Sequence, residues 1–328
     1  MPAAVVPSLT VLDVGHGSCA VLEEAARTVV FDAGPRSGLL EYLLQRNIKQ
    51  IDLVLISHAD EDHIAGLIAL LAASSIAIKA VRLNTDSLKG SDIWDDLLFE
   101  LDELARKGSL DFSPALTAAD NGKFDSTDVK LEILGPTTYL AGKGPGSKDH
   151  QGRKITTNSI SAIIRLHYKA APVALLTGDM DQIGFDELMR VGAVMRTPVL
   201  IFPHHGGHAG PDMAKFSAGL FDQVKPGHVL FSIGRGLHST PIPAVVAEAR
   251  KIANVRISCT QLSEHCSPTV PAKDHTHLSP AFARGRDQRH CCAGSIIIPL
   301  EPGKPAFPIW KEHQEFISIA APTALCRK

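Results

Sequence analysis

Cysteine, surplus charge and long apolar runs are all scarce in this sequence, and each shortage excludes a class of protein. Six cysteines among 328 residues are too few for a disulfide scaffold. The 33 basic and 35 acidic residues leave a formal net charge of −2, which argues against a protein drawn to nucleic acid by its global charge. This net charge does not exclude a local basic groove on the surface. The 45 % of hydrophobic residues is enough for a sizeable core.

Membrane-spanning and export signals are also missing from the sequence. No uncharged apolar run approaches the roughly 20 residues that a membrane span needs. Residues 1–6 pass directly into a predicted strand rather than into the apolar core of a signal peptide. We therefore expect a protein without a membrane segment, working in the cytoplasm with reduced thiols.

The stretch around residue 60 carries the strongest signal for function. Four potential metal ligands follow one another closely: His58, Asp60, Asp62 and His63. A strand-like run, 53–56, precedes them and a helix-compatible run follows. Alternate residues of an extended loop face the same way, so His58 and Asp60 can share one ion. The adjacent Asp62 and His63 point apart and suit a second ion. Imidazole and carboxylate ligands fit zinc, manganese or iron.

The alternative for this stretch is a polar loop that caps a helix, with Asp60 or Asp62 at the N-cap. Capping needs a single small polar residue and gives no reason for two histidines. The pattern instead resembles the HxHxDH signature of the metallo-β-lactamase superfamily, in the HxDxDH variant of ComEC-type DNA-uptake proteins. The resemblance extends from Leu9 to about Ile298.

The order of predicted elements indicates an α/β fold with packed layers. The resemblance makes this fold more specific, as a four-layer αββα sandwich with metal ions at one edge. The predicted strands are 8–14, 19–22, 28–31, 51–56, 80–83, 129–134, 162–166, 173–177, 199–202 and 228–235, and the predicted helices are 37–45, 64–71, 93–105, 182–191 and 244–252.

Further residues take roles from the same resemblance. Asp179 ends a Leu-Thr-Gly-Asp motif whose aspartate bridges the two metals in the superfamily. Asp32, at the end of a strand, is implied to support the metal loop, although an ordinary turn aspartate is the alternative. His16 and Asn158 are two further predicted supporting residues. Asn158 stands where many relatives carry a metal-binding histidine, which leaves the ligand set of the first ion incomplete.

Histidines cluster again after the predicted strand 199–202. His204 and His205 resemble the His-His-Gly motif of the family, and we expect His204 to bind the second ion with His205 as its neighbour. Both are included among the predicted metal ligands. His208 and His238 are predicted, with Asp62, to act in catalysis.

The implied cofactor is one or two divalent metal ions, zinc or manganese. Two ions can activate a hydroxide for hydrolysis, and Asp60 in place of histidine favours manganese modestly. The resemblance implies a phosphodiesterase or nuclease, with DNA or another phosphodiester as partner. Two alternatives stay open: a hydrolase of a small ester, lactone or cyclic nucleotide, and a non-catalytic regulatory protein that keeps the fold.

Two basic features bear on an anionic substrate. The loop 142–154 is a predicted flap over the site, or equally a solvated loop, and carries Lys143, Lys148, His150, Arg153 and Lys154. Arg235 is either a phosphate contact or a surface arginine. A long cleft lined by these residues favours a polymer, whereas a closed apolar pocket favours a small substrate.

The end of the chain departs from the family pattern. We predict a hydrolase domain over 1–300 and an extended tail over 301–328, where prolines are frequent. The predicted strands 255–260 and 294–298 are expected to pair as a hairpin around a Cys/His-rich insertion, at about 259–292. Its thiols suggest a structural zinc site, and an irregular loop with incidental histidines is the alternative. The candidate zinc ligands are Cys259, Cys266, Cys291 and Cys292.

Overall fold

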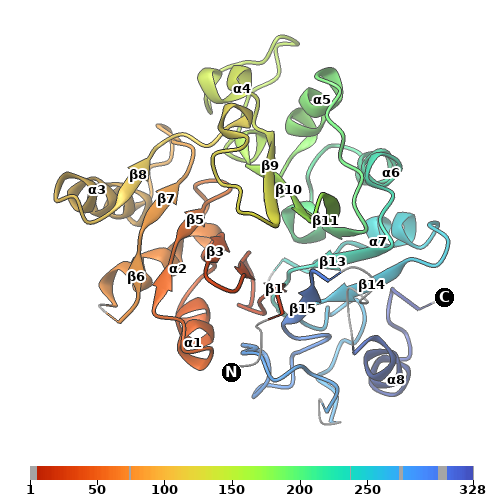
Figure 1. Ribbon diagram of the computed structural model, residues 1–328. Helices are drawn as coiled ribbons and strands as arrows, with labels where there is room; N and C mark the ends of the chain where they lie inside the picture. The colour runs from red at the N-terminus through yellow and green to blue at the C-terminus, as the bar shows by residue number, and fades with distance from the viewer. Residues whose placement is uncertain (1–5, 74, 237, 273–275, 302–308, 328) are drawn as a thin grey trace.

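Two β-sheets packed face to face form the centre of the molecule (Figure 1). The computed structural model describes residues 6–73, 75–236, 238–272, 276–301 and 309–327. The first sheet has the strand order β15 (Ile296–Pro299), β1 (Ser8–Val11), β2 (Ala20–Glu23), β3 (Thr28–Phe31), β5 (Leu53–Leu55), β7 (Ala80–Arg82) and β8 (Asp111–Ser113). The second has the order β14 (Arg256–Cys259), β13 (His228–Phe231), β12 (Val199–Ile201), β11 (Ala171–Leu176), β10 (Ile163–Tyr168) and β9 (Val129–Gly135).

Helices cover the outer faces of both sheets. Apolar side chains of three helices pack on the first sheet: α1 (Gly38–Gln45), α2 (Glu61–Ala72) and α3 (Asp92–Arg106). Four others pack on the second: α5 (Gln182–Arg190), α6 (Met213–Val224), α7 (Pro243–Ala249) and α8 (Trp310–Ala320). A separate apolar cluster fills the space between the sheets. The predicted four-layer αββα sandwich is therefore confirmed. The remaining elements are α4 (Thr138–Lys143) and the short pair β4 (Gln50–Ile51) and β6 (Ala77–Ile78).

Strand direction explains why residues far apart in sequence meet. Strands β3 and β5 are parallel, and so are β11, β12 and β13. Parallel strands end at the same edge of a sheet, so the loops that follow them gather there. Those loops, together with the first turn of α2, carry Asp32, the His58–His63 segment, Asp179 and the His204–His205 pair.

Two expectations about the chain's second half are wrong, and one helix was missed. Strands β14 and β15 do not form a hairpin: β14 pairs with β13 in the second sheet and β15 with β1 in the first. The segment predicted as an extended tail contains α8, because Phe316 and Ile317 supply an apolar face that packs on the second sheet. Helix α6 was not expected from the sequence, although Asp212 caps it. Residues 302–308 and 328 of the tail and 273–275 of the insertion lie outside the described residues.

Over the described part of the chain, no helix is both long and apolar enough to span a bilayer.

A buried histidine in the second sheet predicts that the fold weakens in acid. His228 on β13 is 2 % exposed, and its Nε2 lies 2.7 Å from the hydroxyl of Ser258 on β14. Burial, with Arg256 nearby, lowers the pKa of His228 to about 3. As the pH falls below about 6.5, the histidine of the unfolded chain therefore gains a proton, whereas His228 of the folded protein stays neutral. The folded state therefore keeps its full stability above about pH 6.5 and loses part of it as the pH falls from there toward 3.

We expect this residue to lower the free energy of unfolding by up to about 1.4 kcal/mol per pH unit within that window. Urea unfolding of the wild type and His228→Asn between pH 7 and pH 4 measures the effect. The variant should show the shallower pH slope, whatever its absolute stability. Equal slopes would mean that His228 does not carry the effect; His313, also buried with a pKa lowered to about 3, would then be examined next.

Candidate metal centre

The loop between β5 and α2 presents its acidic side chains to a site rather than to the helix. Asp60 occupies the N-cap position of α2, yet its side chain makes no capping hydrogen bond. Its Oδ2 lies 3.3 Å from His58 Nε2, and the Lys89 ammonium contacts its other oxygen. Burial raises the pKa of Asp60, but His58 and Lys89 outweigh it and lower this pKa to about 2. The Asp60 side chain therefore does not cap the helix, contrary to the capping alternative.

Asp32 holds the histidines of this loop in place from the end of β3. Its Oδ1 accepts the Ser57 backbone N–H at 2.7 Å, and its Oδ2 accepts the Ser57 hydroxyl at 2.9 Å. His63 Nδ1 lies 2.8 Å from the same Oδ2, and His58 Nδ1 lies 2.9 Å from Ser57 Oγ. Because both Nδ1 atoms are occupied, the Nε2 atoms of both rings are turned toward the site.

Asp179, from the loop after β11, stands between histidines of the two sheets. His63 Nε2 and His205 Nε2 lie 3.2 and 3.6 Å from its Oδ1. His204 Nδ1 lies 2.8 Å and His58 Nε2 3.9 Å from its Oδ2. Burial raises the pKa of this carboxyl, but His63, His205 and His204 together lower it well below its usual range. Both oxygens of one carboxylate therefore face ring nitrogens.

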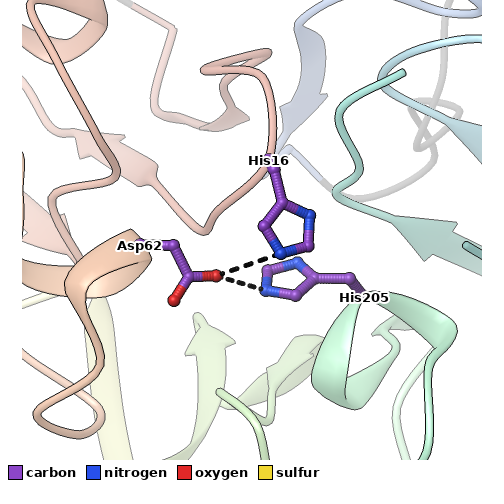
Figure 2. A group of neighbouring side chains, drawn as sticks. All are labelled: His16, Asp62 and His205. Carbon is purple, nitrogen blue, oxygen red and sulfur yellow. Dashed lines mark hydrogen bonds and ion pairs between the residues drawn. The ribbon is translucent and has the colours of Figure 1, made fainter. Parts of the chain in front are cut away.

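A second group of ligands forms around Asp62 (Figure 2). Its Oδ2 lies 3.1 Å from His205 Nε2 and 3.5 Å from His16 Nε2. The Nδ1 of His205 is 2.7 Å from the backbone oxygen of Ser232, at the end of β13, which aims Nε2 at Asp62. Burial and His205 lower the pKa of His16 to about 4, so this ring stays neutral and able to bind a metal.

The residues present fit divalent metal ions. Among the described residues, two groups bring three ligand atoms within 4.8 Å of one another: His58, His63 and Asp179, and His16, Asp62 and His205. Within the first group, His58 Nε2, His63 Nε2 and Asp179 Oδ1 are buried without a hydrogen-bond partner. Buried polar atoms are normally satisfied, so orphaned atoms that converge are what a metal ligand set leaves behind.

Protons and metal compete for the same rings. Burial lowers the pKa of His63, but Asp179, Asp32 and Asp62 outweigh it and raise this pKa well above its usual value. The pKa of His205 is raised against burial by Asp179 and Asp62. Since metal ligands must be deprotonated, metal affinity rises with pH.

The structure gives His204 and His205 positions different from those expected from the sequence. His204 was expected to bind the second ion, but His205 is the one that faces Asp62, and it is 5 % exposed. His204 is half-buried and contacts Asp179 and Asn158 Nδ2, which lies 3.3 Å from its Nδ1. Both histidines have left-handed backbone, with φ of 52° and 55°. Such φ values are uncommon outside glycine and cluster at functional sites.

His208 and His238 lie at the mouth of the site. Both are exposed and line one cavity of about 350 Å³ with His16, Asp62 and Asp179. The rings of His238 and His16 lie 4.4 Å apart between centroids. The structure therefore places both predicted catalytic histidines within reach of a molecule bound over the metal ligands.

The basic loop 142–154 is not part of this cavity or of the groove beside it. Arg153 forms ion pairs with Asp149 and Asp186 and is thereby held to α5. Arg235 does line the adjoining groove, but its guanidinium donates to the backbone oxygens of Leu262, Ser267 and Pro268.

The four cysteines proposed as zinc ligands do not form a common site. Cys291 Sγ lies 3.3 Å from Asp13 Oδ2, whereas Cys259, Cys266 and Cys292 line a small apolar cavity together with Cys326. Neither group of potential metal ligands found among the described residues contains cysteine. Burial raises the pKa of the Cys259 and Cys292 thiols. The geometry thus gives the predicted zinc site no support.

Sequence reasoning missed several residues that shape the site. Ser57 links Asp32 to both histidines of the loop, and Lys89 neutralises Asp60 from 29 residues away. Ser232 aims His205 through a backbone oxygen, which no side-chain motif reports. Asp13, 0 % exposed, anchors the insertion beneath the His16 turn. The signal that the sequence offers for Asp13 is a single carboxylate in an apolar strand, two positions before Gly15.

Comparison with known proteins agrees with this geometry. A model of the metallo-beta-lactamase superfamily matches residues 12–212. Competence protein ComA of Neisseria gonorrhoeae is 23 % identical over 233 residues, which cover 69 % of this chain. The chain spans only 27 % of the length of that relative.

Solved structures with low sequence identity also align with this chain. The metallo-beta-lactamase fold protein YhfI from Bacillus subtilis aligns with a TM-score of 0.49 at 13 % identity, covering 77 % of this chain and 96 % of its own. Igni18, a metallo hydrolase from Ignicoccus hospitalis, aligns with a TM-score of 0.45 at 16 % identity, covering 78 % and 97 %.

Replacing Asp32 should weaken metal binding without removing a ligand. In Asp32→Asn, an amide replaces one carboxylate oxygen, so Ser57 and His63 lose a charged acceptor and His63 is less firmly oriented. Loss of such a supporting partner typically costs about 10–100-fold in metal affinity. Competition with a chromophoric chelator measures the affinity for zinc and manganese. Asp111→Asn, on the exposed β8, is the matched control. Equal affinities in wild type and Asp32→Asn would contradict the supporting role.

Proposed function

The chain belongs to the metallo-β-lactamase superfamily, and on that premise we propose that this metallo-hydrolase cleaves phosphodiester bonds. The observation that carries the proposal is the shape of the surface around the metal ligands. The cavity over Asp62, Asp179 and His205 opens into a larger groove of about 640 Å³, and the two share His16, Asp62 and His238. An open polar groove suits an extended anionic substrate better than a small apolar one.

Seven side chains would hold the ions. His58, His63 and Asp179, with Asp60 beside them, suit the first ion, and His16, Asp62 and His205, with Asp179 beside them, suit the second. When bound, the ions supply Lewis-acid polarisation of a phosphoryl oxygen and lower the pKa of water. Zinc and manganese both accept these nitrogen and oxygen ligands.

The remaining polar side chains serve the substrate. His208 and His238 line the mouth of the cavity, where an imidazolium can donate a proton to the leaving alkoxide oxygen. Lys89 balances the charge of Asp60, so this carboxylate adds less repulsion toward an anionic substrate. The similarity to a competence protein supports DNA as the phosphodiester.

The two alternatives are disfavoured by particular features of the site. A hydrolase of a small ester or lactone calls for an enclosed apolar pocket, whereas this cavity is lined by five histidines and three carboxylates. A non-catalytic protein is expected to have lost metal ligands, whereas two groups of three potential ligand atoms are present here. Asn158 removes one expected ligand of the first ion only.

The test is hydrolysis of bis(p-nitrophenyl) phosphate, single-stranded DNA and plasmid DNA, each with added Mn²⁺, Mg²⁺ or Zn²⁺ and with EDTA. We expect metal-dependent cleavage that falls by more than about 100-fold in Asp62→Ala and Asp179→Asn, since even a supporting partner of a metal ligand is worth about 10–100-fold. Asp96→Ala, an exposed change on α3, is the matched control and should retain full activity.

Bound metal without cleavage of any phosphodiester would overturn the proposal. In that case, hydrolysis of p-nitrophenyl acetate, a lactone or a cyclic nucleotide would identify the small-substrate alternative. A protein that binds no divalent metal at pH 8 would be the non-catalytic relative.

A further inference from the structure

Two arginines without an ionic partner line the groove that leads away from the metal ligands. Arg36 and Arg284 both belong to its lining, together with His16 and Asp62. No ion pair or side-chain hydrogen bond joins either guanidinium to another described residue. Arginines elsewhere on the surface are commonly paired; Arg82, Arg153 and Arg190, for example, each contact a carboxylate. Two unpaired guanidinium groups in one groove are therefore available to an anion.

Arg284 is held at the groove by a buried network. The backbone oxygen of Asp13 accepts the Arg284 N–H at 2.9 Å. The Asp13 carboxylate accepts the Gly285 N–H at 2.9 Å and a Gln261 amide N–H at 2.8 Å. The same carboxylate accepts the Gly15 N–H at 3.1 Å, immediately before His16. One buried carboxylate thus fixes the insertion and the His16 turn relative to each other, and Arg284 is the residue next to Gly285 in that network.

Arg36 belongs to the same groove lining but comes from a different segment of the chain. It follows Pro35 in the turn between β3 and α1 and has left-handed backbone, with φ of 67°. This conformation costs about 1–2 kcal/mol for a residue with a Cβ. The turn lies tightly against Gly17: a Cβ added there would meet the Asp62 backbone oxygen at 2.4 Å and Pro35 Cδ at 2.6 Å. Arg36 is therefore carried by a segment packed on the metal-binding loop itself.

The charge of the groove favours an anion. Asp62 is committed to the metal set, which leaves Glu61 as the acidic side chain of the lining that opposes a phosphate. Against it stand Arg36, Arg284 and the positive charge of Arg235, whose guanidinium contacts only backbone oxygens. Gln288 and His290 complete the polar wall supplied by the insertion. At about 640 Å³ the groove is too large for a lone phosphate.

We propose that Arg36 and Arg284 form a subsite for a backbone phosphate next to the scissile phosphodiester, so that the substrate is an oligonucleotide chain lying along the groove. This inference rests on the proposed function. The fold positions the metal ligands, and the insertion supplies Arg284, one of the two arginines of the subsite.

Binding tests the subsite without turnover. A fluorescently labelled ten-nucleotide thymidine oligomer is titrated with Asp179→Asn protein, and anisotropy gives the affinity between 50 and 300 mM salt. Adding Arg36→Ala and Arg284→Ala should weaken binding by about 10-fold or more. It should also reduce the slope of log affinity against log salt by about 1.4, the value for two phosphate contacts on a single strand. Arg36→Lys with Arg284→Lys keeps both charges and should restore most of the salt dependence.

The matched control is Arg106→Ala with Arg196→Ala, two exposed arginines remote from the groove, which should leave affinity unchanged. Equal affinity and salt slope in the Arg36/Arg284 double variant and in this control would overturn the subsite. Circular dichroism melts of each variant check that the proteins are folded.

Catalysis separates this inference from the proposed function. In the active background, the Arg36/Arg284 variant should lower the ratio of kcat/KM for the oligonucleotide to that for bis(p-nitrophenyl) phosphate by about 10-fold or more, since only the chain reaches the subsite. An unchanged ratio, with both substrates cleaved, would overturn the subsite and leave the proposed function standing. Cleavage of neither substrate would sink the proposed function, and the anisotropy result would still decide whether the groove takes an anionic chain.

Discussion

The buried carboxylate of Asp179 is the constraint on which the site depends. A charge taken out of water costs several kcal/mol unless it is paired, and this side chain is only 3 % exposed. Its partners come from both halves of the sandwich: His63 from the first turn of α2, which follows β5, and His204 and His205 from the segment after β12. The edge where the two sheets meet is therefore held by one carboxylate, and a divalent cation is the species best suited to share its charge with the surrounding rings.

The elements around Asp179 serve to orient those rings. Asp32, Ser57 and the Ser232 carbonyl occupy the Nδ1 atoms of His63, His58 and His205, which leaves Nε2 of each ring facing inward. Strain is concentrated in the same place, because Asp32, His204, His205 and His238 all have positive φ. A backbone that accepts such conformations at several site residues is stabilised by packing elsewhere, here by the two helix layers and the apolar cluster between the sheets.

Local patterns made the metal loop and the layer order predictable from sequence. The ligands at 58–63 lie close together in the sequence, and each later motif follows directly after a strand. Patterns among neighbouring residues are therefore enough to predict them. The choice between His204 and His205 depends on a left-handed backbone that adjacent identical residues do not reveal. Strand β15 was assigned the wrong partner because pairing with β1 joins positions nearly 290 residues apart. Lys89 and Asp13 went unnoticed for the same reason: their contacts are distant in sequence.

Net charge was equally uninformative about the groove, because a formal charge of −2 sums over all residues and does not show which arginines lack an ionic partner. What matters to an anionic chain is the local field beside the ions, and screening limits that field to about 8–10 Å at physiological salt. Arg36 comes from a turn packed on the metal loop, and Arg284 from the insertion that Asp13 anchors. On the proposed function, a fold shared by many hydrolases would come to bind a polymer in this way: the sheet edge stays as it is, and the segment between β14 and β15 supplies one wall of the groove.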